Sequence, residues 1–189
     1  MSNQYAIIAG SGFADFADGA RMRDIETRYG RPSAPLRETS FGSADVVVLP
    51  RHGDAHTLPP HTINYRANIA ALRDIGATAI VALNTVGVVS DKCQPGQLAV
   101  PSQLIDYTWG REHTFNEGED GRFEHIDFTH PFSADIRAAL LNAAAAAGVD
   151  CVDGGVYAAT QGPRLETAAE VERLKRDGVD IVGMTAMPE

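Results

Sequence analysis

The hydrophobic positions of the chain form two alternating patterns. Short, unbroken apolar runs that end in small or polar residues are typical of buried strands entering tight loops. Such runs occur at residues 4–12, 44–53, 77–87, 154–163 and 179–185. A further run, at residues 96–108, is interrupted by Pro101, which cannot donate a hydrogen bond to a neighbouring strand.

Between these runs, apolar residues recur at helical spacing. In the first such segment, Ile69, Leu72 and Ile75 follow one another at intervals of three, and Gly76 is a suitable C-terminal stop. Ser133 is the predicted N-cap of the second. The predicted helices lie at residues 63–76, 133–148 and 166–178, and the predicted long loop lies at residues 110–132.

The alternation of strands and helices predicts an α/β fold. A chain of 189 residues suffices for one domain with a sizeable core, and it contains no repeat or linker that would divide it. We therefore expect a single domain over residues 1–189, with a central parallel or mixed sheet flanked by helices. Ligands of such sheets bind beyond the carboxyl ends of the strands, so function is sought in the loops at those ends.

Composition and charge narrow the classes of partner. The chain is 44% hydrophobic and 22% charged, as in ordinary globular proteins, and its net charge of −9 argues against nucleic acid and anionic membranes as main partners. No apolar run reaches the ~18 residues that span a bilayer, and the N-terminus lacks the pattern of a signal peptide. Two widely separated cysteines predict neither a disulfide framework nor a metal site. We expect a cytoplasmic protein.

The first strand ends in the loop Gly10-Ser11-Gly12. Two glycines let backbone N–H groups approach an anion, and the serine hydroxyl is a further donor. The loop is neither a dinucleotide fingerprint, because Asp15 stands where the third glycine would be, nor a phosphate loop of the Gly-Lys-Ser/Thr type. A plain tight turn is the alternative.

Arg51 and His52 follow the second strand. The planar guanidinium of Arg51 suits bidentate binding of phosphate, and His52 offers a second donor. The alternative is that Arg51 pairs with a structural carboxylate. His52, His56 and His61 also suggest a metal site, but Pro59 and Pro60 interrupt any continuous helical face. We expect no metal.

Further polar residues stand near other strand ends. Thr85 and Thr185 place hydroxyls there, and Met184 is either core or an apolar platform for a sugar. Glu166 is either a cap of the third helix or an acceptor for a ligand N–H. The hydroxyls of Thr85 and Thr185, together with Ser11 and residues 51–52, predict a binding site for an oxyanion at one edge of one sheet.

This set resembles the trimeric purine nucleoside phosphorylase and methylthioadenosine phosphorylase family. Six stretches in family order carry the resemblance, at residues 7–13, 49–69, 83–89, 104–115, 159–170 and 180–189. The sequences HTINYRANI, GREHTF, HIDFTHPF and QGPRLET are most similar to the bacterial S-methyl-5′-thioinosine phosphorylase branch.

The resemblance implies an enzyme of the pentosyltransferase class. Inorganic phosphate would attack C1′ of S-methyl-5′-thioinosine or a related purine nucleoside, releasing hypoxanthine and 5-methylthioribose 1-phosphate. Such a reaction relies on positioning and electrostatics and implies phosphate as co-substrate, with no metal or organic cofactor. The phosphate site that the resemblance implies comprises Ser11, Arg51, His52, Thr85 and Thr185.

The resemblance also implies a nucleoside site. Met184 would lie under the ribose, and Leu165 and Glu166 would line the purine pocket. Glu166 matches the family's purine-contacting carboxylate and favours a 6-oxopurine, because adenine N1 carries no proton. His125 resembles a residue that reaches into a neighbouring subunit's site, which implies a homotrimer or a dimer of trimers.

Two departures from the family pattern bear on these expectations. Ser11 stands where many relatives have threonine, and family chains continue beyond the segment that ends at Glu189. The C-terminal part of the fold is therefore expected to be missing, including the Asn or Asp that contacts purine N7, so the catalytic acid is not assigned. The alternatives are a methylthioadenosine phosphorylase, a general 6-oxopurine nucleoside phosphorylase, and an inactive nucleoside- or phosphate-binding protein.

Overall fold

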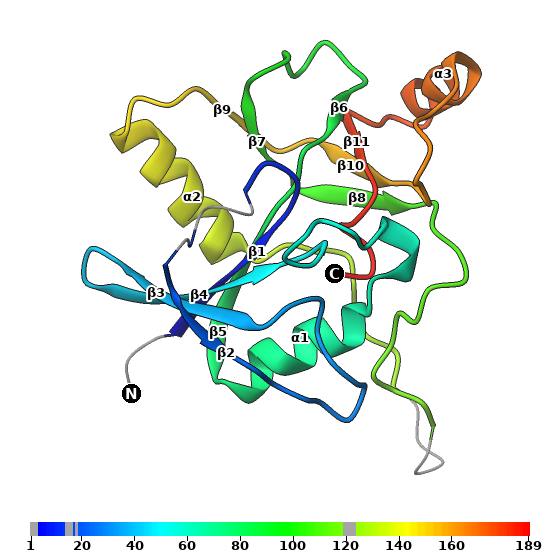
Figure 1. Cartoon of the computed structure of the whole chain (residues 1–189). Coiled ribbons are helices and arrows are strands. Elements are labelled where there is room, and N and C mark those ends of the chain that lie inside the picture. The colour runs from blue at the N-terminus through cyan, green and yellow to red at the C-terminus, as the bar shows by residue number, and fades with distance from the viewer. Residues whose placement is uncertain (1–3, 14–16, 18, 119–123) are drawn as a thin grey trace. The chain divides into compact units, whose positions relative to one another are not determined.

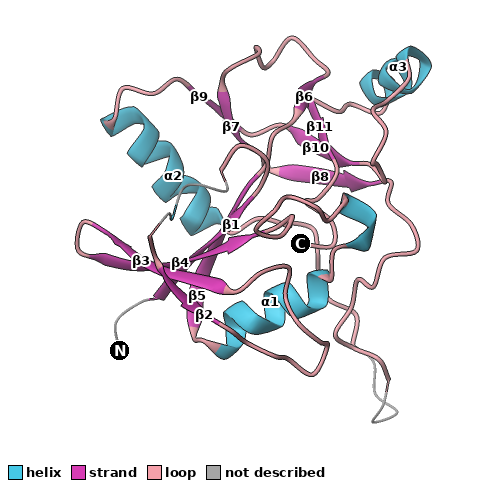
Figure 2. Cartoon of the chain, viewed as in Figure 1, coloured by secondary structure: helices cyan, strands magenta, loops and turns pink. Residues whose placement is uncertain are grey.

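The computed structural model describes residues 4–13, 17, 19–118 and 124–189. Within the α/β fold that the sequence predicts, the chain forms two compact units. Unit 1 comprises residues 1–85, 110–115 and 188–189, and unit 2 comprises residues 86–109 and 116–187. Their elements can be followed by label in Figure 1 and by type in Figure 2.

Unit 1 contains a five-stranded mixed sheet in the order β2-β3-β4-β1-β5. Strands β4, β1 and β5 are parallel, whereas β2 and β3 add antiparallel strands on one side. A 3-10 turn and helix α1 lie between β4 and β5 in the sequence. The bounds are β1 Gln4–Ala9, β2 Arg21–Arg23, β3 Leu36–Phe41, β4 Ala44–Pro50, η2 Pro60–Thr62, α1 Tyr65–Asp74 and β5 Ala77–Leu83.

The central strands of unit 1 are covered on both faces. Ile8 and Leu49 belong to a core cluster with Leu72 of α1, while Ala9 and Val48 belong to a second cluster. Side chains alternate between the two faces of a strand, so a strand buried on both faces needs an unbroken apolar sequence. This explains why the continuous apolar runs predicted β1 and β4 correctly.

Unit 2 contains a four-stranded mixed sheet in the order β6-β11-β10-β8 and a two-stranded parallel sheet, β7-β9. The apolar run around Pro101 is indeed split, because β7 and β8 lie on either side of the proline and join different sheets. The bounds are β6 Gly87–Val88, β7 Leu98–Val100, β8 Gln103–Asp106, α2 Ala134–Ala146, β9 Cys151–Asp153, β10 Val156–Ala159, α3 Ala168–Arg176 and β11 Ile181–Gly183.

The predicted helix ends agree with the structure. The Ser133 side chain accepts from the Ile136 N–H at the start of α2, and Gly76 follows α1 with a φ of 85°. Thr167 caps α3 in a reciprocal capping box with Glu170. Glu166 is therefore not needed as the cap, which leaves its carboxylate for another role.

Candidate active site

Three parallel strands of unit 1 end at the same level. Ala9 of β1 lies opposite Pro50 of β4 and opposite Leu83 of β5. The residues that follow these strands therefore emerge at one edge of the sheet. They include the loop of residues 10–12, the pair at residues 51–52, and Thr85.

The loop after β1 is held from both sides. The Gly10 N–H donates to the Leu83 carbonyl at 3.1 Å, and the Thr85 hydroxyl donates to the Ser11 carbonyl at 2.9 Å. Gly12 has a φ of 85°, a conformation that glycine adopts without strain. In this structure Thr85 thus supports the loop through Ser11, and its hydroxyl proton is already engaged.

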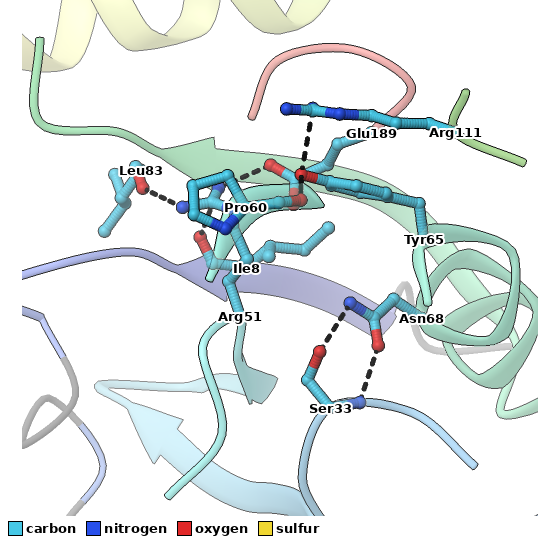
Figure 3. Close-up of polar contacts among 9 residues, drawn as sticks. All are labelled: Ile8, Ser33, Arg51, Pro60, Tyr65, Asn68, Leu83, Arg111 and Glu189. Carbon is cyan, nitrogen blue, oxygen red and sulfur yellow. Dashed lines mark hydrogen bonds and ion pairs between the residues drawn. The ribbon is translucent and has the colours of Figure 1, made fainter. Parts of the chain in front are cut away.

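Arg51 is buried in an ion pair with Glu189, which is the carboxylate pairing considered as the alternative for this arginine. Its Nε donates to Glu189 Oε2 at 2.6 Å, and its Nη2 donates to Oε1 of the same carboxylate. The Arg51 and Glu189 side chains are only 1% and 3% exposed. Dashed lines in Figure 3 show the pair, together with the bonds from Arg51 to the Leu83 and Ile8 carbonyls.

These contacts correct one detail of the sequence interpretation. Glu189 occupies the Nε/Nη2 edge of Arg51, which is the edge expected to bind phosphate bidentately. The remaining nitrogen, Nη1, donates to Leu83 O at 2.9 Å and lies against Gly10. Any direct contact of Arg51 with an anion at the edge of the sheet is therefore confined to the Nη1 nitrogen.

His52 and His56 lie beside the same loop. Their rings are 4.7 Å apart, and His56 Nε2 lies 3.4 Å from the Ser11 hydroxyl. Burial lowers the pKa of His52, and nearby Arg51 and His56 lower it further, against a raising effect of its bond to the Leu58 carbonyl. A neutral His52 with Nδ1–H donated to Leu58 O, 2.8 Å away, leaves Nε2 as an acceptor.

No group of three metal-ligating side chains occurs among the residues that the structure describes. His56 was considered at the sequence level only as a metal ligand. Its contact with Ser11 places it at the same edge of the sheet, and its positive φ of 52° is unusual for a residue other than glycine. The sequence offered no signal for this conformation.

Unit 2 repeats the strand-end arrangement. Ala159 of β10 lies opposite Gly183 of β11 and opposite Asp106 of β8, and all three strands are parallel. Thr160 follows β10, and Met184 and Thr185 follow β11. The prediction that Thr185 shares a sheet with Ser11 is therefore wrong, because β11 pairs with β10 and β6 instead.

A pocket of about 340 Å³ lies in unit 2, within the size range of small-molecule sites. Glu166 lines it, and the Thr160 hydroxyl donates to Glu166 Oε1 at 2.7 Å. Met184 lies against Gly162, another residue of the wall. The pocket is lined by Tyr107, Trp109, Thr160, Gln161, Gly162, Arg164, Glu166, Glu170, Arg173 and Leu174.

The pocket contains a residue that the sequence interpretation missed. Trp109, 72% exposed, supplies an aromatic wall, and its backbone N–H donates to Gln161 Oε1 at 3.1 Å. Leu165 does not line the pocket and is 77% exposed, and His125 is exposed in the coil before α2. Of the residues predicted for the nucleoside site, Glu166 lines this pocket, whereas Leu165, Met184 and His125 do not.

None of the helices within the described residues is both long and apolar enough to cross a bilayer.

Comparisons with known proteins identify the family of this chain. Residues 4–189 match the family described as the Phosphorylase superfamily. A probable S-methyl-5′-thioinosine phosphorylase of Xanthomonas campestris is 52% identical over 186 residues, which are 97% of this chain and 74% of that protein. A 6-oxopurine nucleoside phosphorylase of Pyrococcus furiosus is 42% identical over 190 residues, 97% of this chain and 71% of that protein.

A solved structure shows the same fold. Methylthioadenosine phosphorylase of Schistosoma mansoni without ligand superposes with a TM-score of 0.92 at 35% identity, covering 100% of this chain and 74% of that one. The family match extends over both units, and the strand-end loops lie within it. The chain therefore belongs to the phosphorylase superfamily.

Proposed function

We propose that the protein catalyses the phosphorolysis of S-methyl-5′-thioinosine. Inorganic phosphate and the nucleoside are its substrates, and hypoxanthine and 5-methylthioribose 1-phosphate are its products. Membership of the superfamily supports the reaction class. The 52% identity to a probable S-methyl-5′-thioinosine phosphorylase supports the choice of nucleoside.

The observation that carries the proposal is the common end of β4, β1 and β5. It gathers a glycine-containing loop, an arginine nitrogen and two imidazoles at one edge of a sheet. Backbone N–H groups and a guanidinium are the donors that proteins use for phosphate. Phosphate held there would be oriented for attack by one of its oxygens.

The chemistry needs positioning more than covalent help. A phosphate oxygen forms a bond to C1′ while the C1′–N9 bond breaks and its electron pair leaves with the purine. A neutral His52 suits the phosphate, because hydrogen phosphate carries one P–O–H that donates to a free imidazole nitrogen. Ser11 and His56 complete the proposed contacts on the loop side.

Glu166 is the proposed recognition residue for the base. One of its oxygens accepts from the Thr160 hydroxyl, so the other can accept from a purine N–H. Hypoxanthine carries a proton on N1 and adenine does not, so an acceptor oxygen of Glu166 favours the 6-oxopurine. An acceptor that the bound base covers without offering it a donor would disfavour adenine nucleosides strongly.

The remaining roles follow from the family resemblance. Met184 lies under the ribose, Thr185 contributes a hydroxyl to the phosphate, Leu165 borders the base, and His125 serves the site of a neighbouring subunit. Thr85 supports the phosphate-binding loop by donating its hydroxyl to the Ser11 carbonyl. These assignments imply a homotrimer or a dimer of trimers. The protein acts in purine salvage in the cytoplasm, with phosphate as co-substrate and no metal or organic cofactor.

A substrate comparison tests the proposal. Methylthioinosine, methylthioadenosine, inosine and adenosine are incubated with the protein, each with and without phosphate, and base release is followed by chromatography. We expect phosphate-dependent release that is fastest from methylthioinosine. Equal cleavage without phosphate would exclude a phosphorylase, and preference for methylthioadenosine would overturn the role of Glu166. Faster cleavage of inosine would instead favour a general 6-oxopurine nucleoside phosphorylase.

A further inference from the structure

The Arg51 guanidinium is almost fully engaged by the protein itself. A guanidinium has five N–H groups. Within the described chain, Glu189 takes one from Nε and one from Nη2, Ile8 O lies 3.5 Å from Nη2, and Leu83 O takes one from Nη1. One N–H of Nη1 is left over, on the nitrogen that lies against Gly10.

The carboxylate that binds Nε and Nη2 of Arg51 comes from far along the sequence. Glu189 is 138 residues from Arg51, yet its side chain is 3% exposed and meets the guanidinium in the bidentate geometry that fixes both position and plane. Burial raises the pKa of Glu189, and the adjacent Arg51 opposes that rise. The pair thus holds the guanidinium in one orientation inside the unit.

We propose that Glu189 is a positioning residue for phosphate. By occupying the Nε/Nη2 edge of Arg51, it turns Nη1 toward the Gly10 loop and leaves a single directed donor for the anion. This inference rests on the proposed phosphorylase function, and it adds a residue that does not touch the substrate.

The inference predicts a selective kinetic defect. In Glu189→Gln, an amide N–H₂ group faces the donors of Arg51, so the guanidinium loses its fixed orientation while its charge remains. We expect the KM for phosphate to rise about 10- to 100-fold, as misplacement of a binding group typically requires. The KM for the nucleoside should change by less than about twofold, because neither Arg51 nor Glu189 lines the pocket proposed for the base. A simple loss of folded enzyme would lower the rate and alter neither KM.

Two further variants set the controls. Glu189→Asp keeps the charge but is one methylene shorter, so it should restore part of the phosphate affinity. Glu38→Gln removes a different arginine–glutamate pair of unit 1, in which Arg23 Nη1 lies 3.2 Å from Glu38 Oε1 on the edge of the sheet. Its KM for phosphate should equal that of the wild type.

A double variant guards against simple misfolding. Arg51→Met with Glu189→Leu replaces the buried pair by apolar side chains, an exchange that buried pairs often tolerate better than loss of one partner. It should melt at a higher temperature than Arg51→Met alone and yet show the same weak use of phosphate. Thermal melts with and without inorganic phosphate give the binding readout independently of turnover.

The outcomes separate the two ideas. If wild-type protein cleaves nucleosides without needing phosphate, the proposed function fails. If the wild type depends on phosphate but folded Glu189→Gln keeps the wild-type KM for phosphate, the positioning role fails. A lower KM for phosphate in Glu189→Gln would also overturn it, because Glu189 would then compete with the anion instead of orienting its partner.

Discussion

Among the described glycines of unit 1, Gly10 is the one where an added methyl group would meet the closest neighbouring atoms, so Gly10→Ala should destabilise the fold. A Cβ added at Gly10 would lie closer to Arg51 Nη1 and to the Leu83 carbonyl oxygen than real Cβ atoms approach other atoms. The same carbonyl accepts from Gly10 N at 3.1 Å and from Arg51 Nη1 at 2.9 Å. Gly10→Ala therefore forces a methyl group into the point where two hydrogen bonds meet.

The size of the effect follows from these contacts. Overpacking a closed site costs about 1–3 kcal/mol, and losing the charged hydrogen bond from Arg51 to Leu83 costs about 1.5–3 kcal/mol. Because relaxation relieves part of both, we expect Gly10→Ala to lower the free energy of unfolding by about 2–5 kcal/mol. It should also raise the KM for phosphate, since Arg51 Nη1 is displaced.

Gly12→Ala is the matched control in the same loop. Gly12 has a φ of 85° but nothing within 4 Å of the added Cβ, so only the left-handed backbone is penalised, by about 1–2 kcal/mol. Urea unfolding followed by far-ultraviolet circular dichroism gives both free energies. A loss in Gly10→Ala no larger than that in Gly12→Ala, at equal m-values, would refute the packing argument.

Three other predictions concern single side chains. Tyr65 accepts from buried Arg111 at 3.1 Å, so Tyr65→Phe should lower the free energy of unfolding by about 1–3 kcal/mol in urea titrations, and a loss below about 0.5 kcal/mol would contradict this. The hydrogen bond from Arg164 is the main cause that lowers the pKa of Glu170 to about 2. The ionised Glu170 should therefore stabilise the fold above pH 4.5, and this stabilisation should disappear as the pH falls toward 2. In Glu170→Gln, the free energy of unfolding should fall less steeply over the same pH range. Burial lowers the pKa of His52 from 6.5, so the unfolded state binds more protons than the folded state just below that pH. The free energy of unfolding should therefore fall as the pH drops below 6.5. If its dependence on pH is unchanged in His52→Gln, other groups cause the fall.

The sequence predicted those elements whose signal is local. Strand β1 is an unbroken apolar run because both of its faces are covered, and helix α2 begins at a serine that caps it. Strand β3 (Leu36–Phe41) was missed because only Leu36 is buried and the polar residues after it face partly outward. Its signal lay in Gly42, which allows the hairpin turn back into β4.

The sequence predicted only in part which candidate residues lie at the same edge of a sheet. Ser11, His52 and Thr85 were identified as residues after strands, and pairing at Ala9 places all three at one edge. Which sheet a strand joins depends on distant partners, so the sequence pattern alone could not separate Thr185 from them. The Glu189 partner of Arg51 was missed likewise, because no local pattern links residues so far apart.

The long separation of Arg51 and Glu189 has a consequence for biosynthesis. Ribosomes add about 5–20 residues per second, so the 138 residues between them take roughly 7 to 28 s to make. Once β5 has been made, the first sheet can assemble only around an arginine whose counter-charge does not yet exist. Because a buried, unpaired cation is strongly unfavourable, we expect the nascent N-terminal half to stay open at the β4 end and to depend on chaperones until residue 189 emerges.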